Sequence, residues 1–313
     1  MSHLDAPLIP QEFAERVRGY PPDSVNSGAR HAVSGVDWLR TLPRLIDDLL
    51  REWSLVPDGR SWSGHGAVVV PVRADTGEAV LKVTWPHTEA AAEHMALRAW
   101  EGRGSVRLLR SDPARFALLL ERLDGDRSLR YEPVEDACAV IGGLLSELKV
   151  VATPRIPSLH AYLEVLGAEP DPPPDAMPRR FVQQGRRLRA ELMSHFGDEP
   201  WLLHTDLHFD NVLAATRQPW LAIDPHPLRG DRAYEVAPVL WNRFAELGTG
   251  AAMRWSVRER LETVCAPAGI DEERARAWSI VREVDNARWA VQDGDREALT
   301  RHVELLKALG GSR

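Results

Sequence analysis

The sequence HTDLHFDN at residues 204–211 is followed by WLAIDP at residues 220–225, with the turn-forming residues TRQP at 216–219 between them. The apolar runs at 211–215 and 220–224 are predicted to form two short strands. An antiparallel hairpin returns the chain to the end from which it started. The residue that opens the first strand and the residue that closes the second should therefore meet.

Three oxygen-bearing side chains are expected at the open end of this hairpin. Asn211 opens the first strand, Asp224 closes the second, and Asp206 lies just upstream. Together they suit a hard cation such as Mg²⁺, with one carboxylate left to act as a base. Each residue alone would be an ordinary loop residue, because Asp and Asn often hydrogen-bond their own backbone. The joint spacing favours the site.

The same spacing is found in a known class of enzymes. The pattern H-x-D-x-x-x-x-N, followed by a hairpin and an Asp after an apolar strand, resembles the protein-kinase arrangement. In that arrangement the first Asp is catalytic, and the Asn and the second Asp bind metal. The motif therefore predicts a kinase-like site built around Asp206.

Length and charge set the broad class of protein. The chain has 313 residues, which fits two packed lobes, and 44% of the residues are hydrophobic, as in a globular enzyme. The formal net charge of −7 argues against a general nucleic-acid binder and is compatible with a cationic small-molecule substrate.

The sequence carries no disulfide or targeting signal. Cys138 and Cys265 have no C-x-x-C partner and are expected to pack as small hydrophobic residues. The first residues lack the basic start and apolar core of a signal peptide. Apolar runs stay well short of the roughly 18 residues that cross a membrane. The chain is therefore expected to be cytoplasmic, with no membrane partner.

The first part of the chain is expected to form a helix and a small antiparallel sheet. Apolar residues at spacings of three and four predict an amphipathic helix at 36–53. Alternating apolar residues and turn formers predict strands at 68–72, 79–83, 106–110 and 115–120.

A turn with two glycines precedes the first of these strands. Gly64 and Gly66 lie in the sequence SWSGHG at 61–66. The backbone N–H groups of such a turn can approach phosphates. Two glycines are few for a phosphate loop, so an ordinary hairpin turn is the alternative.

Lys82 lies near the middle of an apolar strand, where an unpaired ammonium group is costly to bury. The helix predicted at 87–100 carries Glu89 and Glu93, which are four residues apart and therefore share a face. Either carboxylate could hold Lys82 while its ammonium group reaches the α- and β-phosphates of a nucleotide. The alternative is an edge-strand lysine whose charge reaches water.

The last predicted strand leads into the segment from Glu121 to Leu123. A strand that ends by crossing to the next domain leaves backbone groups unpaired, and those groups could bind the edge of an adenine. The boundary is therefore placed here. The N-terminal lobe at 1–121, with a helical N-terminal extension, is expected to bind nucleotide phosphates. The C-terminal lobe at 122–313 is expected to hold the catalytic loop and the acceptor.

From residue 133 onward the pattern is mostly helical. The helix at 179–196 carries five arginines, which are expected on a solvated face and in part paired with acids. Further helices are predicted at 234–247, 251–265, 271–290 and 296–309.

Taken together, the chain resembles the aminoglycoside phosphotransferases, and within them the streptomycin 6-phosphotransferase and hydroxyurea phosphotransferase branch. The resemblance implies an α+β, two-lobed, protein-kinase-like fold with a small antiparallel-sheet N-lobe and a mostly helical C-lobe. It runs from about Ser61 to Asn242. It is carried by LRAW at 97–100, LLLERLDG at 118–125, DLHFDNVL at 206–213, WLAIDP at 220–225, GD at 230–231 and YEVAP at 234–238.

The resemblance implies transfer of the γ-phosphate of ATP to a hydroxyl of a small molecule, first of all a streptomycin-like aminoglycoside. Antibiotic resistance, a step of antibiotic biosynthesis and the phosphorylation of another metabolite all stay open as the role, because they would share these motifs. Asp206 would orient the acceptor hydroxyl and take its proton, while Asn211 and Asp224 would hold Mg²⁺. Lys82, steadied by one of the two glutamates, would grip the phosphates. The backbone at 121–123 would bind the adenine.

Three residues depart from the family pattern without removing a catalytic group. Thr205 stands where a small or different residue is usual, His226 where a lysine or acid is frequent, and Glu235 where an Asp is usual. Asp231, Glu235 and Asp293 could supply acidic contacts to a cationic acceptor. The alternative for these acids is a solvated surface.

Other functions remain open at this point. Hydroxyurea or another small metabolite could be the acceptor, because the motifs would be the same. A metal-dependent hydrolase is a hypothesis from another class, since His204 and His208 are four residues apart with Asp206 between them and imitate a zinc ligand set. It leaves the strand-rich first lobe without a role. An inactive kinase fold that serves as a binding module is the third hypothesis.

Overall fold

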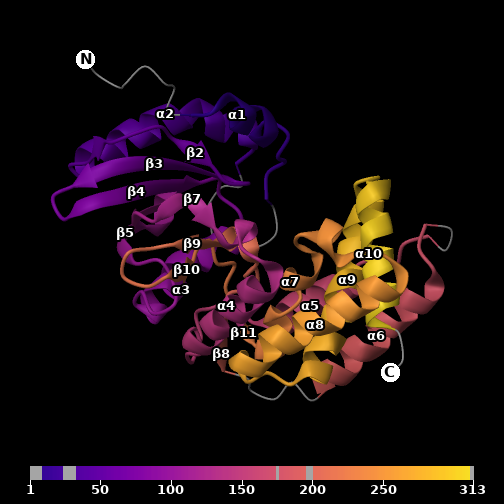
Figure 1. Cartoon of the computed structure of the whole chain (residues 1–313). Coiled ribbons are helices and arrows are strands. Elements are labelled where there is room, and N and C mark those ends of the chain that lie inside the picture. Colours follow the sequence, from indigo (N-terminus) through magenta and orange to yellow (C-terminus); the bar gives the residue numbers. More distant parts are fainter. Residues whose placement is uncertain (1–8, 24–32, 174–175, 195–199, 311–313) are drawn as a thin grey trace. The chain divides into compact units, whose positions relative to one another are not determined.

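The computed structural model describes residues 9–23, 33–173, 176–194 and 200–310, and it divides the chain into two units (Figure 1). Unit 1 is Met1–Leu123 and unit 2 is Asp124–Arg313, whereas the sequence places the boundary after Glu121. Both units combine helices with antiparallel strands. The α+β class is therefore as predicted.

In the described part of unit 1, six strands form one antiparallel sheet in the order β1-β3-β4-β6-β5, with β2 also paired to β3. The four predicted strands correspond to β3, β4, β5 and β6, and their ends differ from the prediction by at most two residues. The short strands β1 and β2 do not follow from the sequence pattern. The bounds are β1 (Val56–Pro57), β2 (Trp62–Ser63), β3 (Ala67–Ala74), β4 (Gly77–Thr84), β5 (Leu108–Asp112) and β6 (Ala117–Glu121).

One face of this sheet is covered by α1 (Gln11–Val17) and α2 (Gly35–Glu52), which Figure 1 shows along the same side of the strands. Helix α2 confirms the prediction at 36–53. The core between them contains alternate residues of β3 and β4, including Leu81 and Val83. Because side chains alternate along a strand, Lys82 points to the opposite face of the sheet.

That opposite face holds the segment predicted as a helix at 87–100. It is a 3₁₀ turn, η1 (Glu89–Ala92), followed by α3 (Glu93–Trp100). The buried side of α3 includes Glu93 at its first turn. Glu93 at the start of α3 is therefore buried, whereas Glu89 in η1 is exposed.

Unit 2 is built mainly from helices, in which α4 packs on α8, and α9 packs on both α6 and α10. The predictions at 251–265, 271–290 and 296–309 are confirmed by α8, α9 and α10. The prediction at 179–196 is confirmed by α6 up to Ser194, and residues 195–196 lie outside the described residues. None of the helices in the described chain combines the length and apolar character of a membrane span. The bounds are α4 (Val134–Glu147), α5 (Leu159–Ala168), α6 (Arg179–Ser194), α7 (Pro238–Trp241), α8 (Gly250–Ala268), α9 (Glu272–Gln292) and α10 (Arg296–Leu309).

The helix predicted at 234–247 is wrong. The segment is divided into 3₁₀ turns on either side of the short α7, and Arg243 has a left-handed backbone with φ of 53°. Arg260 of α8 is buried, and its Nη1 atom donates to the carbonyl oxygens of Val239 and Asn242, both at 2.8 Å. This distant guanidinium satisfies carbonyl groups that the break in the helix leaves without an intrahelical partner.

Two small antiparallel sheets in unit 2 hold the central motif. Strand β9 (Val212–Ala214) pairs with β10 (Trp220–Ala222), which confirms the predicted hairpin, and also with β7 (Asp124–Ser128). Strand β8 (Trp201–Leu203) pairs with β11 (Leu228–Gly230). The loop at 204–211 thus runs from the end of one sheet to the start of the other.

The two cysteines both lie in unit 2. Cys138 and Cys265 are free and buried, and burial raises the pKa of each thiol to about 12. A thiol with so high a pKa is neutral at physiological pH and unreactive. The prediction that both pack as small hydrophobic residues is confirmed.

The close approach of α4 and α8 depends on Gly142. A Cβ atom at 142 would lie 2.6 Å from the carbonyl oxygen of Val264, whereas one at Gly143 would meet no atom within 4 Å. We expect Gly142→Ala to lower the free energy of unfolding by about 1–3 kcal/mol through overpacking. Gly143→Ala should leave it unchanged or raise it by up to about 1 kcal/mol. Denaturant titration of both variants measures this, and equal values would contradict the packing argument.

Candidate active site

The central motif brings Asp206 and Asn211 into direct contact. Nδ2 of Asn211 donates to Oδ2 of Asp206 at 3.0 Å and to its carbonyl oxygen at 2.9 Å. The backbone N–H of Ile223 donates to the carbonyl oxygen of Asn211 at 2.9 Å, which places Asp224 beside it in the chain at the open end of the hairpin. Because the amide nitrogen of Asn211 faces Asp206, its amide oxygen faces away and is the atom that can bind a cation.

The environment of Asp206 keeps its carboxylate ionised. Burial raises the pKa of Asp206, but the hydrogen bond and charge of His208, helped by the charge of His226, outweigh burial, so the pKa lies below its ordinary value. Nε2 of His208 lies 3.5 Å from Oδ2 of Asp206. The sequence suggests His208 only as a zinc ligand and misses this role, although the residue lies inside the motif itself.

His204 is fully buried, and both nitrogens of its ring lie close to backbone groups. Nε2 donates to the carbonyl oxygen of Ile223 at 2.9 Å, and Nδ1 lies 3.4 Å from the backbone nitrogen of Asp206. Burial lowers the pKa of His204 to about 4, so the ring is neutral at neutral pH. A ring held in this way is not a zinc ligand. Over the described residues, no three His, Cys, Asp or Glu side chains are grouped to hold a metal. The zinc ligand set that the hydrolase hypothesis requires is therefore not formed among the described residues.

Two of the three acids predicted to contact an acceptor are buried instead. Glu235 accepts the backbone N–H of His204 at 2.5 Å and also that of Thr205. Burial raises the pKa of Glu235 to about 7, against the opposing effects of these N–H groups and of the charge of Arg232. Glu235 therefore anchors the backbone of the loop and does not face an acceptor.

Asp231 is 5% exposed, and both of its carboxylate oxygens are used inside unit 2. Oδ1 accepts the backbone N–H of Ala233, and Oδ2 accepts Nε of Arg274 at 2.6 Å and the indole N–H of Trp278. This bonding corrects the prediction that Asp231 contacts the acceptor. Asp293 is exposed after the end of α9, and its acceptor contact stays a prediction.

Two of the left-handed non-glycine residues of the described chain lie at the catalytic loop and at the end of the hairpin. Thr205 has φ of 60° and Asp224 has φ of 57°, in the left-handed region that a β-branched residue such as Thr rarely adopts. Such a conformation costs about 1–3 kcal/mol and persists only where the surroundings fix it. Here Oγ1 of Thr205 donates to the carbonyl oxygen of His226 at 2.6 Å. The backbone N–H of His226 in turn donates to the carbonyl oxygen of His204 at 3.0 Å.

In unit 1, Lys82 pairs with Glu93. Their Nζ and Oε1 atoms are 2.7 Å apart, and the two residues are 6% and 3% exposed. Glu89 lies on the exposed side of η1. The structure therefore decides between the two glutamates in favour of Glu93. Lys82 is not an edge-strand lysine, because β4 lies between β3 and β6.

The turn with Gly64 and Gly66 joins β2 to β3, so it is a hairpin turn. A Cβ atom at Gly64 would meet nothing within 4 Å, and one at Gly66 would meet only Cε1 of His87 at 3.7 Å. Neither glycine has a left-handed backbone. The chain's own packing therefore does not require glycine at either position, and the space beside Gly64 is open.

The segment predicted to bind adenine is only partly available. Glu121 lies within β6, its N–H donates to the carbonyl oxygen of Arg107 at 3.1 Å, and its side chain accepts the N–H of Arg107 at 2.7 Å. The expectation of unpaired backbone groups is therefore wrong for the N–H of Glu121. Leu123 follows the strand, and its backbone N–H has no partner in the described chain.

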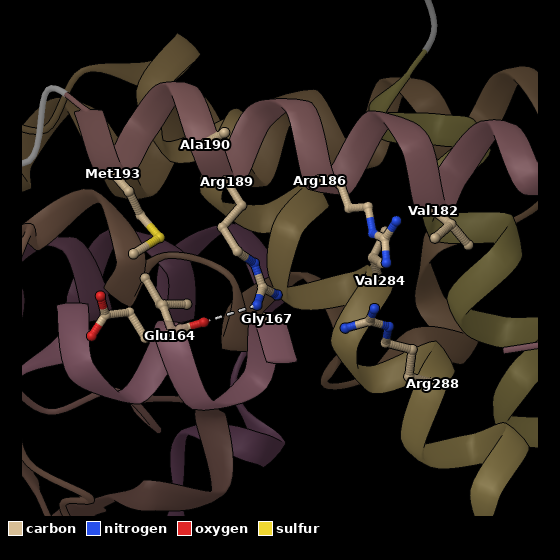
Figure 2. Close-up of a pocket in the computed structure, with 11 residues that line it drawn as sticks. Glu164, Gly167, Val182, Arg186, Arg189, Ala190, Met193, Val284 and Arg288 are labelled. Atoms are coloured by element: carbon tan, nitrogen blue, oxygen red, sulfur yellow. Dashed lines mark hydrogen bonds between the residues drawn. The ribbon is translucent and has the colours of Figure 1, made fainter. Parts of the chain in front are cut away.

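A cavity of about 220 Å³ lies elsewhere in unit 2, between α5, α6 and α9 (Figure 2). It is lined by apolar side chains, by arginines and by Glu164, and it shares no residue with the loop at 204–211. Arg189 is buried there, paired with Asp285 and bonded to the carbonyl oxygen of Leu163. The solvated face predicted for the α6 arginines is therefore wrong for Arg189, whereas its pairing with an acid is as expected.

Solved structures show the fold. The chain aligns with a crystal structure of aminoglycoside phosphotransferase APH(4)-Ia in complex with ADP and hygromycin B, at a TM-score of 0.55 and 15% identity over 85% of this chain and 99% of that one. It also aligns with choline kinase LicA from Streptococcus pneumoniae, at a TM-score of 0.58 and 13% identity over 87% and 99%. The predicted kinase-like fold is confirmed.

Sequence relatives show the family. A streptomycin 6-kinase from Streptomyces glaucescens is 39% identical over 88% of this chain and 92% of its own length. A hydroxyurea phosphotransferase from Kitasatospora aureofaciens is 41% identical over 89% and 82%. The model of the family "Aminoglycoside/hydroxyurea antibiotic resistance kinase" matches residues 52–294. The chain therefore belongs to this family of kinases.

Proposed function

We propose that this kinase transfers the γ-phosphate of ATP to a hydroxyl group of a streptomycin-like aminoglycoside. The relatives named streptomycin 6-kinase support this acceptor class. The observation that carries the proposal is the ionised Asp206, held against Asn211 at the end of the hairpin that carries Asp224. A hydroxyl acceptor needs a base that can accept its proton at neutral pH, and Asp206 meets that need.

The chemical step assigns one role to Asp206. Its carboxylate would orient the acceptor hydroxyl and accept its proton as the oxygen bonds to the γ-phosphorus. The bond from that phosphorus to the β-γ bridging oxygen breaks, and ADP leaves with the electron pair. Such transfers depend mainly on position and charge, so a fixed loop matters more than a strong base.

Mg²⁺ fits the donor atoms at the hairpin end. The amide nitrogen of Asn211 is bonded to Asp206, so its oxygen faces away from Asp206, and Asp224 adds a carboxylate two residues after β10. Oxygen donors of this kind suit a hard divalent cation. When bound, Mg²⁺ would offset the negative charge of the phosphates.

The nucleotide would be bound by unit 1. Lys82, oriented by Glu93, would contact phosphate oxygens through its ammonium group. The turn at Gly64 and Gly66 leaves room for phosphates, and the backbone of Leu123 would contact the adenine.

Hydroxyurea is a second candidate acceptor. A relative named hydroxyurea phosphotransferase is 41% identical over most of this chain, so both acceptor types occur among similar proteins. The net charge of −7 and the exposed Asp293 favour the cationic aminoglycoside. Mass analysis of each compound for an added phosphate distinguishes the two.

Asp206→Asn tests the base. The amide keeps the size of the side chain but cannot accept the proton, so we expect kcat to fall by about 10²–10⁴ with ATP binding retained. The measurement is ATP consumption with streptomycin and, separately, with hydroxyurea. Asp136→Asn on the exposed side of α4 removes the same charge and should have no effect. Equal turnover by the wild type and the Asp206 variant would exclude Asp206 as the base.

Glu93→Gln tests the buried ion pair. The change leaves the ammonium group of Lys82 without its carboxylate, which we expect to lower the free energy of unfolding by about 3–5 kcal/mol and to raise KM for ATP. Glu89→Gln removes an equal charge from the exposed neighbour and serves as the matched control. Equal losses of stability and of ATP affinity in the two variants would show that Glu93 is not the carboxylate that orients Lys82.

Glu235 gives a pH dependence with a defined sign. Its folded pKa of about 7 lies above the ordinary value of 4.5, so in this window the folded chain holds a proton that the unfolded chain releases. The stabilising contribution is therefore present below pH 4.5 and is lost as pH rises to about 7. We expect the difference in unfolding free energy between wild type and Glu235→Gln to fall by up to about 3 kcal/mol across this window. Denaturant titrations at several pH values measure it, and parallel curves would refute it.

A further inference from the structure

We propose that Arg16 and Tyr20, from the helical segment before the sheet, hold the Gly64–Gly66 turn in the conformation that binds phosphate. The inference rests on the proposed nucleotide site and adds positioning residues to it. Both residues lie outside the range 52–294 that the family model matches.

Arg16 and Tyr20 bind two consecutive carbonyl groups of the turn. Nη2 of Arg16 donates to the carbonyl oxygen of Gly64 at 2.6 Å, and Nε donates to that of His65 at 3.2 Å. The hydroxyl of Tyr20 donates to the same oxygen of His65 at 3.1 Å. We call this set of contacts the clamp.

The clamp fixes the direction of the next N–H group. In a trans peptide the C=O and the following N–H point in opposite directions. Because the carbonyl oxygen of His65 faces the clamp, the N–H of Gly66 must face the other way. The carbonyl oxygen of Gly66 is itself bound by the N–H of Trp85 at 2.8 Å, so this glycine is held from both sides.

The N–H of Gly66 has the surroundings that an anion needs. Within the described residues it donates to no group, the space beside Gly64 is open, and only Cε1 of His87 lies near the Cα of Gly66 on its side-chain face. The guanidinium group of Arg16 polarises the peptide through its carbonyl oxygen, which strengthens the N–H as a donor. A turn N–H with these properties suits a phosphate oxygen.

The clamp is rigid because its own helix is anchored. Phe13 and Val17 of α1 are fully buried in the unit 1 core, and the Phe13 ring packs edge-on against Trp38 at 6.0 Å between centroids. The ring of Tyr20 stacks on His65 at 5.7 Å. A turn that is already ordered loses less entropy when it binds a ligand.

Tyr20 acts as a donor at neutral pH. Burial raises the pKa of its hydroxyl, and the charge and hydrogen bond of Arg16 only partly oppose this effect. The hydroxyl therefore keeps its proton and can donate it to the carbonyl oxygen of His65. Replacing Tyr20 by Phe would remove this one bond and leave the ring in place.

Arg16→Met tests the clamp, with Arg18→Met as the matched control. Arg18 is exposed at the end of the same helix, so its loss changes the net charge equally. We expect Arg16→Met to weaken binding of a non-hydrolysable ATP analogue with Mg²⁺ roughly tenfold, measured by calorimetry. KM for ATP should rise with it, while kcat at saturating ATP and binding of adenosine stay unchanged. Tyr20→Phe should show the same pattern at about threefold.

Several results would overturn the clamp. They are Arg16→Met behaving like Arg18→Met, an equal loss of adenosine binding, or a fall in kcat without a change in nucleotide affinity. If Arg16→Met fails to fold, the comparison of Tyr20→Phe with wild type decides the matter. Wild type that binds the analogue leaves the proposed function standing whatever the variants do. Wild type that does not bind it overturns both the clamp and the proposed function.

Discussion

The buried carboxylate of Glu235 is the contact on which the catalytic loop depends. It accepts two successive backbone N–H groups, from His204 and Thr205, directly before Asp206. Burying a carboxylate is costly, as its raised pKa shows, but the two N–H groups compensate part of the cost. The same contact holds Thr205 in a backbone conformation that its side chain disfavours. Glu235 thus stabilises the position of Asp206 from the interior of unit 2 and does not itself face an acceptor.

Unit 1 uses buried charge in a comparable way. Lys82 lies on an interior strand and is oriented by Glu93, the first residue of α3. A buried ion pair adds little stability in itself but fixes geometry strongly, since neither charge can be left alone. In both units, then, a buried carboxylate sets the direction of a functional group.

The sequence predicts what depends on local spacing. The hairpin, the Asp206–Asn211 pair and the two candidate partners of Lys82 all follow from residues close together in the chain. Burial and distant contacts do not follow from spacing. In the sequence, Asp231 and Glu235 are indistinguishable from surface acids. In the structure, Arg274 and Trp278 bind Asp231, and the backbone of the catalytic loop binds Glu235. The helix predicted at 234–247 fails because Arg260 satisfies carbonyl groups about twenty residues away. Glu121 is paired because Arg107, directly before β5, reaches it.

The turn at Gly64 and Gly66 is expected to respond differently to selection for stability and to selection for catalysis. Neither residue is required by the packing or the backbone angles of the turn, so the fold exerts little pressure on their identity. A larger residue there would pass a test of solubility or heat resistance and still crowd a ligand. Screens for solubility or stability would therefore accept substitutions of these glycines that impair ligand binding. Only a screen for catalytic activity would retain both glycines.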